Sequence, residues 1–160
     1  MLSKRLDNVA PSVTVGISSK VKEMRANGID VISLSIGEPD FNIPEKAKEY
    51  GKKSLDDNKT KYDFPAGIPE LRQEICKKLK RENHIDYTPD QIVLSSGAKN
   101  SITNVLLVTT DPGSEVLLPL PYWVSYSEMV KVVNAVPVEV KTSKENNFKL
   151  TKDDLLRAIT

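Results

Sequence analysis

The segment Ile92–Trp123 constrains the fold of this chain most, because it alternates short apolar runs with turns. Ile92–Leu94 is an apolar run, and after a turn of small residues Lys99–Val108 carries apolar side chains at helical spacing. A second turn, Asp111–Gly113, ends that helix, and Glu115–Leu118 has the composition of a buried strand. The segment therefore predicts a strand–helix–strand unit with parallel strands, as found in α/β proteins.

The first turn of this segment is a candidate anion site. The first N–H groups of a helix have no partner inside the helix and lie at the positive end of its dipole. The small residues Ser96, Gly97 and Ala98 would let a phosphate group reach them. Lys99 supports this interpretation, because a cation in the first helical turn is unfavourable unless an anion is near. Two alternatives stay open: the small residues serve packing alone, and Lys99 is a solvated surface lysine.

The composition is that of an ordinary globular protein of 160 residues, with 39% hydrophobic residues, 28% charged residues and a net charge of +1. This length allows one domain with a substantial core. Acidic and basic residues are interspersed, which argues against a surface for nucleic acid or an anionic membrane. No secretory pattern and no membrane-spanning apolar run is found in the sequence, so we expect a soluble, cytoplasmic protein.

Cysteine and histidine chemistry has little basis in this sequence. Cys76 is the only cysteine and His84 the only histidine, which disfavours disulfides, a metal site and a serine triad. Cys76 belongs to an apolar helical pattern, and this favours a core residue over a nucleophile. His84 is expected to be a solvated residue at a polar helix end.

The rest of the chain is expected to continue the α/β pattern. After an irregular start over 1–16, helices are predicted over 17–27, 44–55, 69–83 and 124–133 and from Thr151 on, and strands over 29–36 and 136–140. A polar hairpin-like segment is expected over 142–148. Gly37 follows a strand, where open α/β sheets bind ligands, although a tight turn would explain it too. The last helix stops at Thr160, one strand short of the next step, so we expect the chain to be truncated.

Five motifs keep a characteristic order and spacing over nearly the whole chain: Ser35–Phe41, Lys61-Tyr62 with Pro65–Arg72, Tyr87–Asp90, Ser96–Lys99 and Pro121–Tyr126. As a set they resemble class I, fold-type I aminotransferases, which use pyridoxal 5'-phosphate, and within them the gamma-type aspartate aminotransferases. The resemblance implies the N-terminal part of the PLP-dependent transferase fold, an α/β fold with a mostly parallel sheet and helices on both faces. Residues 1–43 would form an N-terminal arm and the start of a small domain, and 44–160 the N-terminal part of the large cofactor-binding domain.

The resemblance also implies roles for cofactor-binding residues. Gly97, Ala98 and Lys99 would hold the cofactor phosphate, and Trp123 would stack on its ring. Tyr62 would reach across a homodimer interface to the phosphate of the other subunit's cofactor. Without the resemblance, Trp123 would be interpreted as a core aromatic and Tyr62 as a partly exposed loop tyrosine.

Substrate-binding roles follow from the same resemblance. The backbone of Gly37 would lie at the α-carboxylate of the substrate, where a side chain would collide. Lys99 would face the distal carboxylate of aspartate or glutamate, and Trp123 would line the substrate site. Family members that accept prephenate carry a lysine before the Pro-Ser pair, where this chain has Ala10, so prephenate is not the expected substrate.

The implied reaction moves an amino group from an L-amino acid, expected to be aspartate, to 2-oxoglutarate. The family's Schiff-base lysine, ring-pairing aspartate and carboxylate-binding arginine lie in a C-terminal portion that this sequence does not contain, so no catalytic residue is assigned and the chain alone is expected to be inactive. Two alternatives stay open: an aminotransferase for aromatic amino acids, alanine or kynurenine, and a non-catalytic cofactor-binding or dimerisation module.

Overall fold

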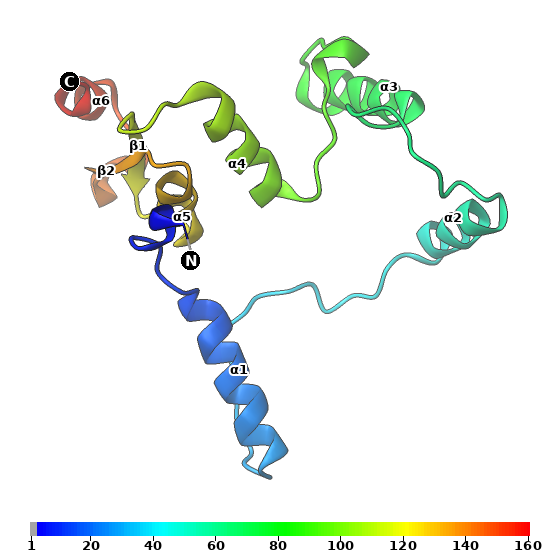
Figure 1. Cartoon of the computed structure of the whole chain (residues 1–160), viewed down its shortest axis with the longest axis horizontal. Coiled ribbons are helices and arrows are strands. Elements are labelled where there is room, and N and C mark those ends of the chain that lie inside the picture. The colour runs from blue at the N-terminus through cyan, green and yellow to red at the C-terminus, as the bar shows by residue number, and fades with distance from the viewer. Residues whose placement is uncertain (1–2) are drawn as a thin grey trace. The chain divides into compact units, whose positions relative to one another are not determined.

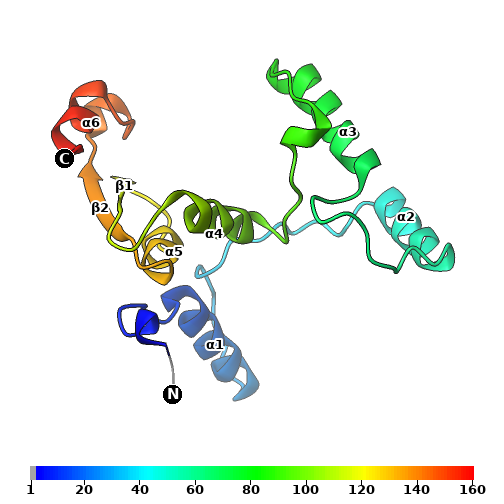
Figure 2. The same ribbon diagram turned by 45° about the horizontal axis from the view of Figure 1, so that its top comes forward.

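The computed structural model describes residues 3–160, which form two compact units. The sheet unit contains the chain up to Lys20 together with Ser96–Thr160, and the helical unit is Val21–Ser95. Figure 1 and Figure 2 show the elements of both units.

The sheet unit is built on two parallel strands, β1 (Glu115–Leu120) and β2 (Val136–Lys141). The helix α5 (Ser125–Val132) is the crossover that parallel neighbours require, and it packs against both strands (Figure 1). Val130 of α5 is the most deeply buried side chain of the described chain, at 1% exposure. It packs with Val133 and Ala135, and the other core residues are Leu118, Met129 and Val140.

Two further helices pack on this strand–helix–strand unit. α4 (Ala98–Thr109) contacts α5, and its Leu106 lies against the Val130 cluster. α6 (Lys152–Ala158) contacts β2. The expected capping box opens α6, because the Thr151 hydroxyl accepts from the Asp154 N–H while the Asp154 carboxylate accepts from the Thr151 N–H.

The N-terminal segment of the sheet unit is held against α5. A 3₁₀ turn, Lys4–Leu6, contacts α5, and the Ala10 N–H donates to Glu128 Oε2 at 2.7 Å. The helix α1 (Val13–Ala26) follows and starts earlier than the sequence predicts. The Ser12 hydroxyl accepts from the Val15 N–H at 3.3 Å, so Ser12 caps a helix whose start was expected at Ile17.

The helical unit contains α2 (Glu45–Asp56), α3 (Pro69–Lys78), a π-helical turn (Leu79–Asn83) and a 3₁₀ turn (Pro89–Gln91). Arg72 of α3 donates to the Pro89 carbonyl at 3.1 Å, which ties α3 to the later turn. His84 ends the π-helical turn with a left-handed backbone, as its expected place at a polar helix end requires.

Three predictions of regular structure are wrong. Residues 29–36 and 92–94 form no strand, so the strand–helix–strand unit is β1–α5–β2 and not the one expected to start at Ile92. A strand needs a hydrogen-bonded neighbour, and the ladder of the described chain joins β1 and β2 only. The segment 142–148 contains a 3₁₀ turn, Lys144–Asn146, in place of a hairpin-like connection.

Candidate cofactor site

The N-terminus of α4 has free backbone donors. Gly97 precedes the helix with φ 82° and ψ 163°, a conformation that is essentially restricted to glycine, and no side chain caps the helix. The first backbone bond into the helix is Ser101 N–H to Gly97 O at 3.2 Å. Within residues 3–160, the N–H groups of Ala98, Lys99 and Asn100 have no acceptor.

The space before this helix end is open. A Cβ placed on Gly97 would meet no heavy atom within 4 Å. Oxygen atoms of a phosphate could therefore approach the free N–H groups, and the helix dipole would favour their negative charge. The helix N-terminus thus has the donors and the room that a phosphate monoester needs.

Trp123 lies beside this helix end and is half-exposed, with 45% of its surface accessible. The Lys99 Nζ atom lies 4.6 Å from the centroid of the indole ring, within the range of a cation–π contact. Tyr126 meets the indole edge-on, with ring centroids 5.5 Å apart and an angle of 89° between planes. Trp123 is therefore not a fully buried core residue, and the structure brings it together with Lys99.

The loop that carries Trp123 connects β1 to α5 and is held by two side chains near the end of β2. The Tyr122 hydroxyl donates to Glu139 Oε1 at 2.8 Å, and the Thr142 hydroxyl donates to the Leu120 carbonyl. The bond to Glu139 raises the pKa of the Tyr122 hydroxyl, because the proton is shared with a carboxylate. The peptide bond between Leu120 and Pro121 is cis.

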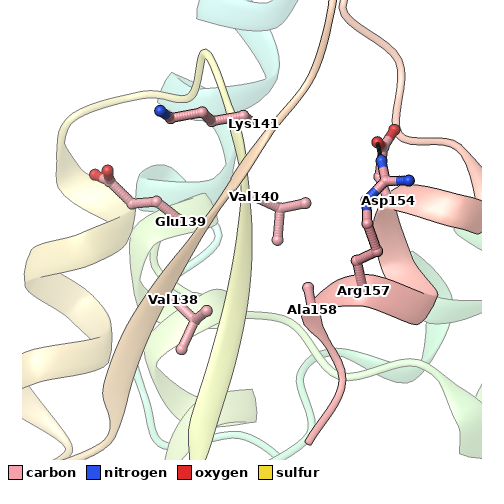
Figure 3. Close-up of a pocket in the computed structure, with 7 residues that line it drawn as sticks. All are labelled: Val138, Glu139, Val140, Lys141, Asp154, Arg157 and Ala158. Atoms are coloured by element: carbon pink, nitrogen blue, oxygen red, sulfur yellow. Dashed lines mark hydrogen bonds and ion pairs between the residues drawn. The ribbon is translucent and has the colours of Figure 1, made fainter.

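Glu139 and Thr142 have roles that sequence reasoning missed. β1 and β2 are parallel, and Leu120 pairs with Lys141, so the C-terminal ends of the two strands lie side by side. A prediction of this pairing could have placed Glu139 and Thr142 next to the Trp123 loop. Figure 3 shows Glu139 and Val140 on opposite sides of β2, with Val140 directed towards α6. The pocket in that view, between β2 and α6, includes none of the site residues expected from the sequence.

Tyr62 and Gly37 belong to the helical unit, while Gly97, Ala98, Lys99 and Trp123 belong to the sheet unit. Tyr62 is fully exposed in the loop between α2 and α3, as its expected contact with a second subunit would allow. Gly37 lies in a segment without regular structure, and a Cβ there would meet no heavy atom within 4 Å. The roles of both residues stay predictions.

A parallel strand–helix–strand unit and a neighbouring helix with an open N-terminus define an α/β protein with a site suited to a phosphorylated ligand. Residues 29–160 match the description "Aminotransferase class I and II", so the chain belongs to this family. No helix within residues 3–160 is both long and apolar enough to cross a membrane.

Relatives of known name agree with this family. The chain is 44% identical over 159 residues to the probable aspartate/prephenate aminotransferase of Thermus aquaticus, covering 99% of this chain and 42% of that protein. It is 42% identical over 160 residues to the aspartate aminotransferase of Bacillus sp. (strain YM-2), covering 100% of this chain and 41% of that protein. The chain thus spans about two fifths of the length of these relatives.

Solved structures confirm the expected α/β fold with a parallel sheet. The aspartate aminotransferase of Thermus thermophilus with maleate superimposes with a TM-score of 0.95 at 43% identity, covering 100% of this chain and 42% of that chain. The aspartate aminotransferase of Rhizobium meliloti gives a TM-score of 0.92 at 36% identity, covering 100% and 40%. The expected resemblance to class I aminotransferases is confirmed.

Proposed function

We propose that this chain forms the phosphate-binding side of a pyridoxal 5'-phosphate site in an aminotransferase that transfers the amino group of L-aspartate to 2-oxoglutarate. The observation that carries the proposal is the free helix end at Gly97–Asn100 beside Lys99 and the half-exposed Trp123. The names of the relatives support an aspartate-directed reaction.

The residues of this chain bind and orient. The N–H groups of Ala98, Lys99 and Asn100 would donate to the phosphate, which fixes the position of the attached ring. The accessible indole of Trp123 would lie against that ring and exclude water from it. Pyridoxal phosphate, when bound, supplies an aldehyde that takes up the amino group and a ring that accepts electrons.

Lys99 and Gly37 would orient the substrate. The Lys99 ammonium group carries the charge that a distal carboxylate needs, and it lies next to Trp123. An acidic substrate such as aspartate is therefore favoured over alanine or an aromatic amino acid. Ala10 does not supply the additional lysine expected for prephenate.

The proposed assembly is a homodimer in which the exposed Tyr62 reaches the phosphate bound by the second subunit. The chain alone would not turn over, because the Schiff-base lysine of the family is not among its motifs. Its own contribution is cofactor binding, which can be measured without turnover.

The experiment is a titration of the full chain with pyridoxamine 5'-phosphate, followed by the emission of Trp123, the only tryptophan. Pyridoxamine 5'-phosphate is preferred to the aldehyde because it forms no imine with surface lysines. We expect quenching with a dissociation constant of about 1 mM, equivalent to about 4 kcal/mol. Inorganic phosphate should reverse the quenching.

The matched variants are Gly97→Ala and Gly16→Ala, both glycines of the sheet unit with open space around them. Alanine at Gly97 cannot keep φ 82° and ψ 163° without strain of about 1–3 kcal/mol, so the N–H groups shift and affinity falls about tenfold. Gly16 lies inside α1, and its replacement should leave affinity unchanged. Quenching that phosphate does not reverse, or that Gly97→Ala leaves intact, would contradict the proposed site.

A further inference from the structure

The loop between β1 and α5 is attached at two points to residues at the C-terminal end of β2. The first is the hydrogen bond from the Tyr122 hydroxyl to Glu139 Oε1, at 2.8 Å, which joins residues 17 positions apart in sequence. The second is the bond from the Thr142 hydroxyl to the Leu120 carbonyl. Trp123 follows Tyr122 directly, so a contact that holds Tyr122 limits where the indole can lie.

The indole itself meets one aromatic ring and one cation. Tyr126 lies one helical turn ahead, at the start of α5, and Lys99 has a long flexible side chain. The Tyr126 N–H also donates to the Trp123 carbonyl at 2.9 Å, so the loop and the first turn of α5 move together. Of the two attachments, the bond from Tyr122 is the one made by the residue next to Trp123.

We propose that Glu139 is a positioning residue, whose carboxylate holds Tyr122 and thereby fixes the orientation of the Trp123 indole for stacking on a ring. Figure 3 shows that the Glu139 side chain leaves β2 on the side opposite to Val140 and α6. The carboxylate is therefore directed away from α6. The use of the positioned indole rests on the proposed function, but the positioning itself does not.

The test compares four variants of the full chain: Tyr122→Phe, Glu139→Leu, Glu139→Gln and, as a control, Glu115→Gln. Glu115 begins the neighbouring strand, at the end away from the Trp123 loop. Far-ultraviolet circular dichroism establishes that each variant keeps its helices. Trp123 emission is then excited at a wavelength that tyrosine does not absorb, and acrylamide is added as a quencher. The quenching constant measures how accessible the indole is in the absence of cofactor.

Tyr122→Phe and Glu139→Leu should each raise the acrylamide quenching constant about twofold, because loss of the hydrogen bond lets the loop open. Glu139→Gln keeps an acceptor oxygen and should stay near the parent value, and Glu115→Gln should not change it. The double variant Tyr122→Phe/Glu139→Leu should equal Tyr122→Phe, because without the Tyr122 hydroxyl the Glu139 carboxylate has no contact with this residue left to lose. An unchanged constant in Glu139→Leu, or effects that add in the double variant, would overturn the proposal.

Titration of the same variants with pyridoxamine 5'-phosphate separates the two proposals. If the parent chain does not bind this probe, the proposed function fails while the acrylamide result still decides the role of Glu139. If the parent binds, Glu139→Leu should weaken binding about threefold through the misplaced indole, and Glu139→Gln should restore it. Binding unaffected by Glu139→Leu would overturn the positioning of the indole for stacking.

Discussion

Among the glycines of the helical unit, Gly67 has the least room for a side chain. A Cβ there would lie 2.3 Å from Leu94 Cδ1 and 2.8 Å from Leu94 Cβ, and its φ is +101°. The Leu94 N–H donates to the carbonyl of Ala66 at 3.0 Å. This bond holds the Leu94 backbone beside the turn, and the Leu94 side chain fills the space next to Gly67. Glycine is required here by space as well as by conformation.

The change Gly67→Ala should therefore destabilise the helical unit by about 2–4 kcal/mol, the sum of overpacking and a strained backbone. The matched control is Gly51→Ala inside α2, where a Cβ meets nothing within 4 Å and alanine should stabilise by about 0.5–1 kcal/mol. Hydrogen exchange of the Leu94 amide reports the local contact, and urea unfolding reports the unit. Equal exchange of that amide in the two variants would show that Leu94 does not confine Gly67.

At the scale of the elements, helices were predictable because their signals are local. Pro69 at the first position of α3 and the Thr151–Asp154 box of α6 mark helix starts in the sequence itself. The start of α1 was missed because residues 1–16 were expected to be irregular, although Ser12 is a good cap. Strands depend on partners far away in sequence, and for this reason 29–36 and 92–94 were wrongly predicted.

In the candidate site, too, residues with a local signal were predictable and residues that depend on distant contacts were not. The open turn before α4 follows from small residues next to one another, so sequence reasoning found Gly97–Lys99 as a helix N-terminus. The half-exposed position of Trp123 beside Lys99 required the resemblance, because an aromatic after a strand is commonly packing. Glu139 and Tyr122 are brought together by the pairing of β1 with β2, and no local sequence pattern indicates this contact.

Glu128 connects α5 to the N-terminal segment and should make that junction sensitive to acid. Its carboxylate accepts from Lys131 Nζ at 2.8 Å and from the Ala10 N–H at 2.7 Å. The hydrogen bond from Lys131, with a further contribution from that of Ala10, lowers the pKa of Glu128. The ionised carboxylate thus stabilises the folded junction fully above the ordinary glutamate pKa of about 4.3, and this stabilisation is lost as pH falls through the lowered value.

Hydrogen exchange of the Ala10 amide, corrected for intrinsic rates, should therefore show protection at pH 6 that decreases below about pH 4. Glu128→Gln should reduce the protection at pH 6 and remove most of its pH dependence, because the amide group does not titrate in this range. Glu145→Gln, at an exposed turn outside this junction, is the control. If Glu128→Gln kept the acid transition of the parent, the loss of protection would be due to another titrating group.

At the scale of the whole molecule, the described chain has a small core and much exposed apolar surface. Val130 is the only described side chain below 2% exposure. Along the segment that was expected to be a strand, Ile32 is 89% and Leu34 95% exposed, and Phe41 further on is 86% exposed. Large apolar side chains exposed in such number are typical of a surface that binds a partner or of a chain prone to aggregate.

The isolated chain should consequently bind anilinonaphthalene sulfonate and unfold over a broad range of temperature, with helical circular dichroism but weak near-ultraviolet signals. The double variant Ile32→Ser/Leu34→Ser should lower dye binding without lowering helix content, because both side chains are exposed. Val130→Ala, by contrast, removes buried methyl groups from the sheet unit and should raise dye binding as that unit loosens. Sedimentation identifies the species that is measured. A sharp, cooperative transition of a monomer that does not bind the dye would show that the exposed residues are covered within the chain itself, and would remove the reason to expect a partner surface over Ile32 and Leu34.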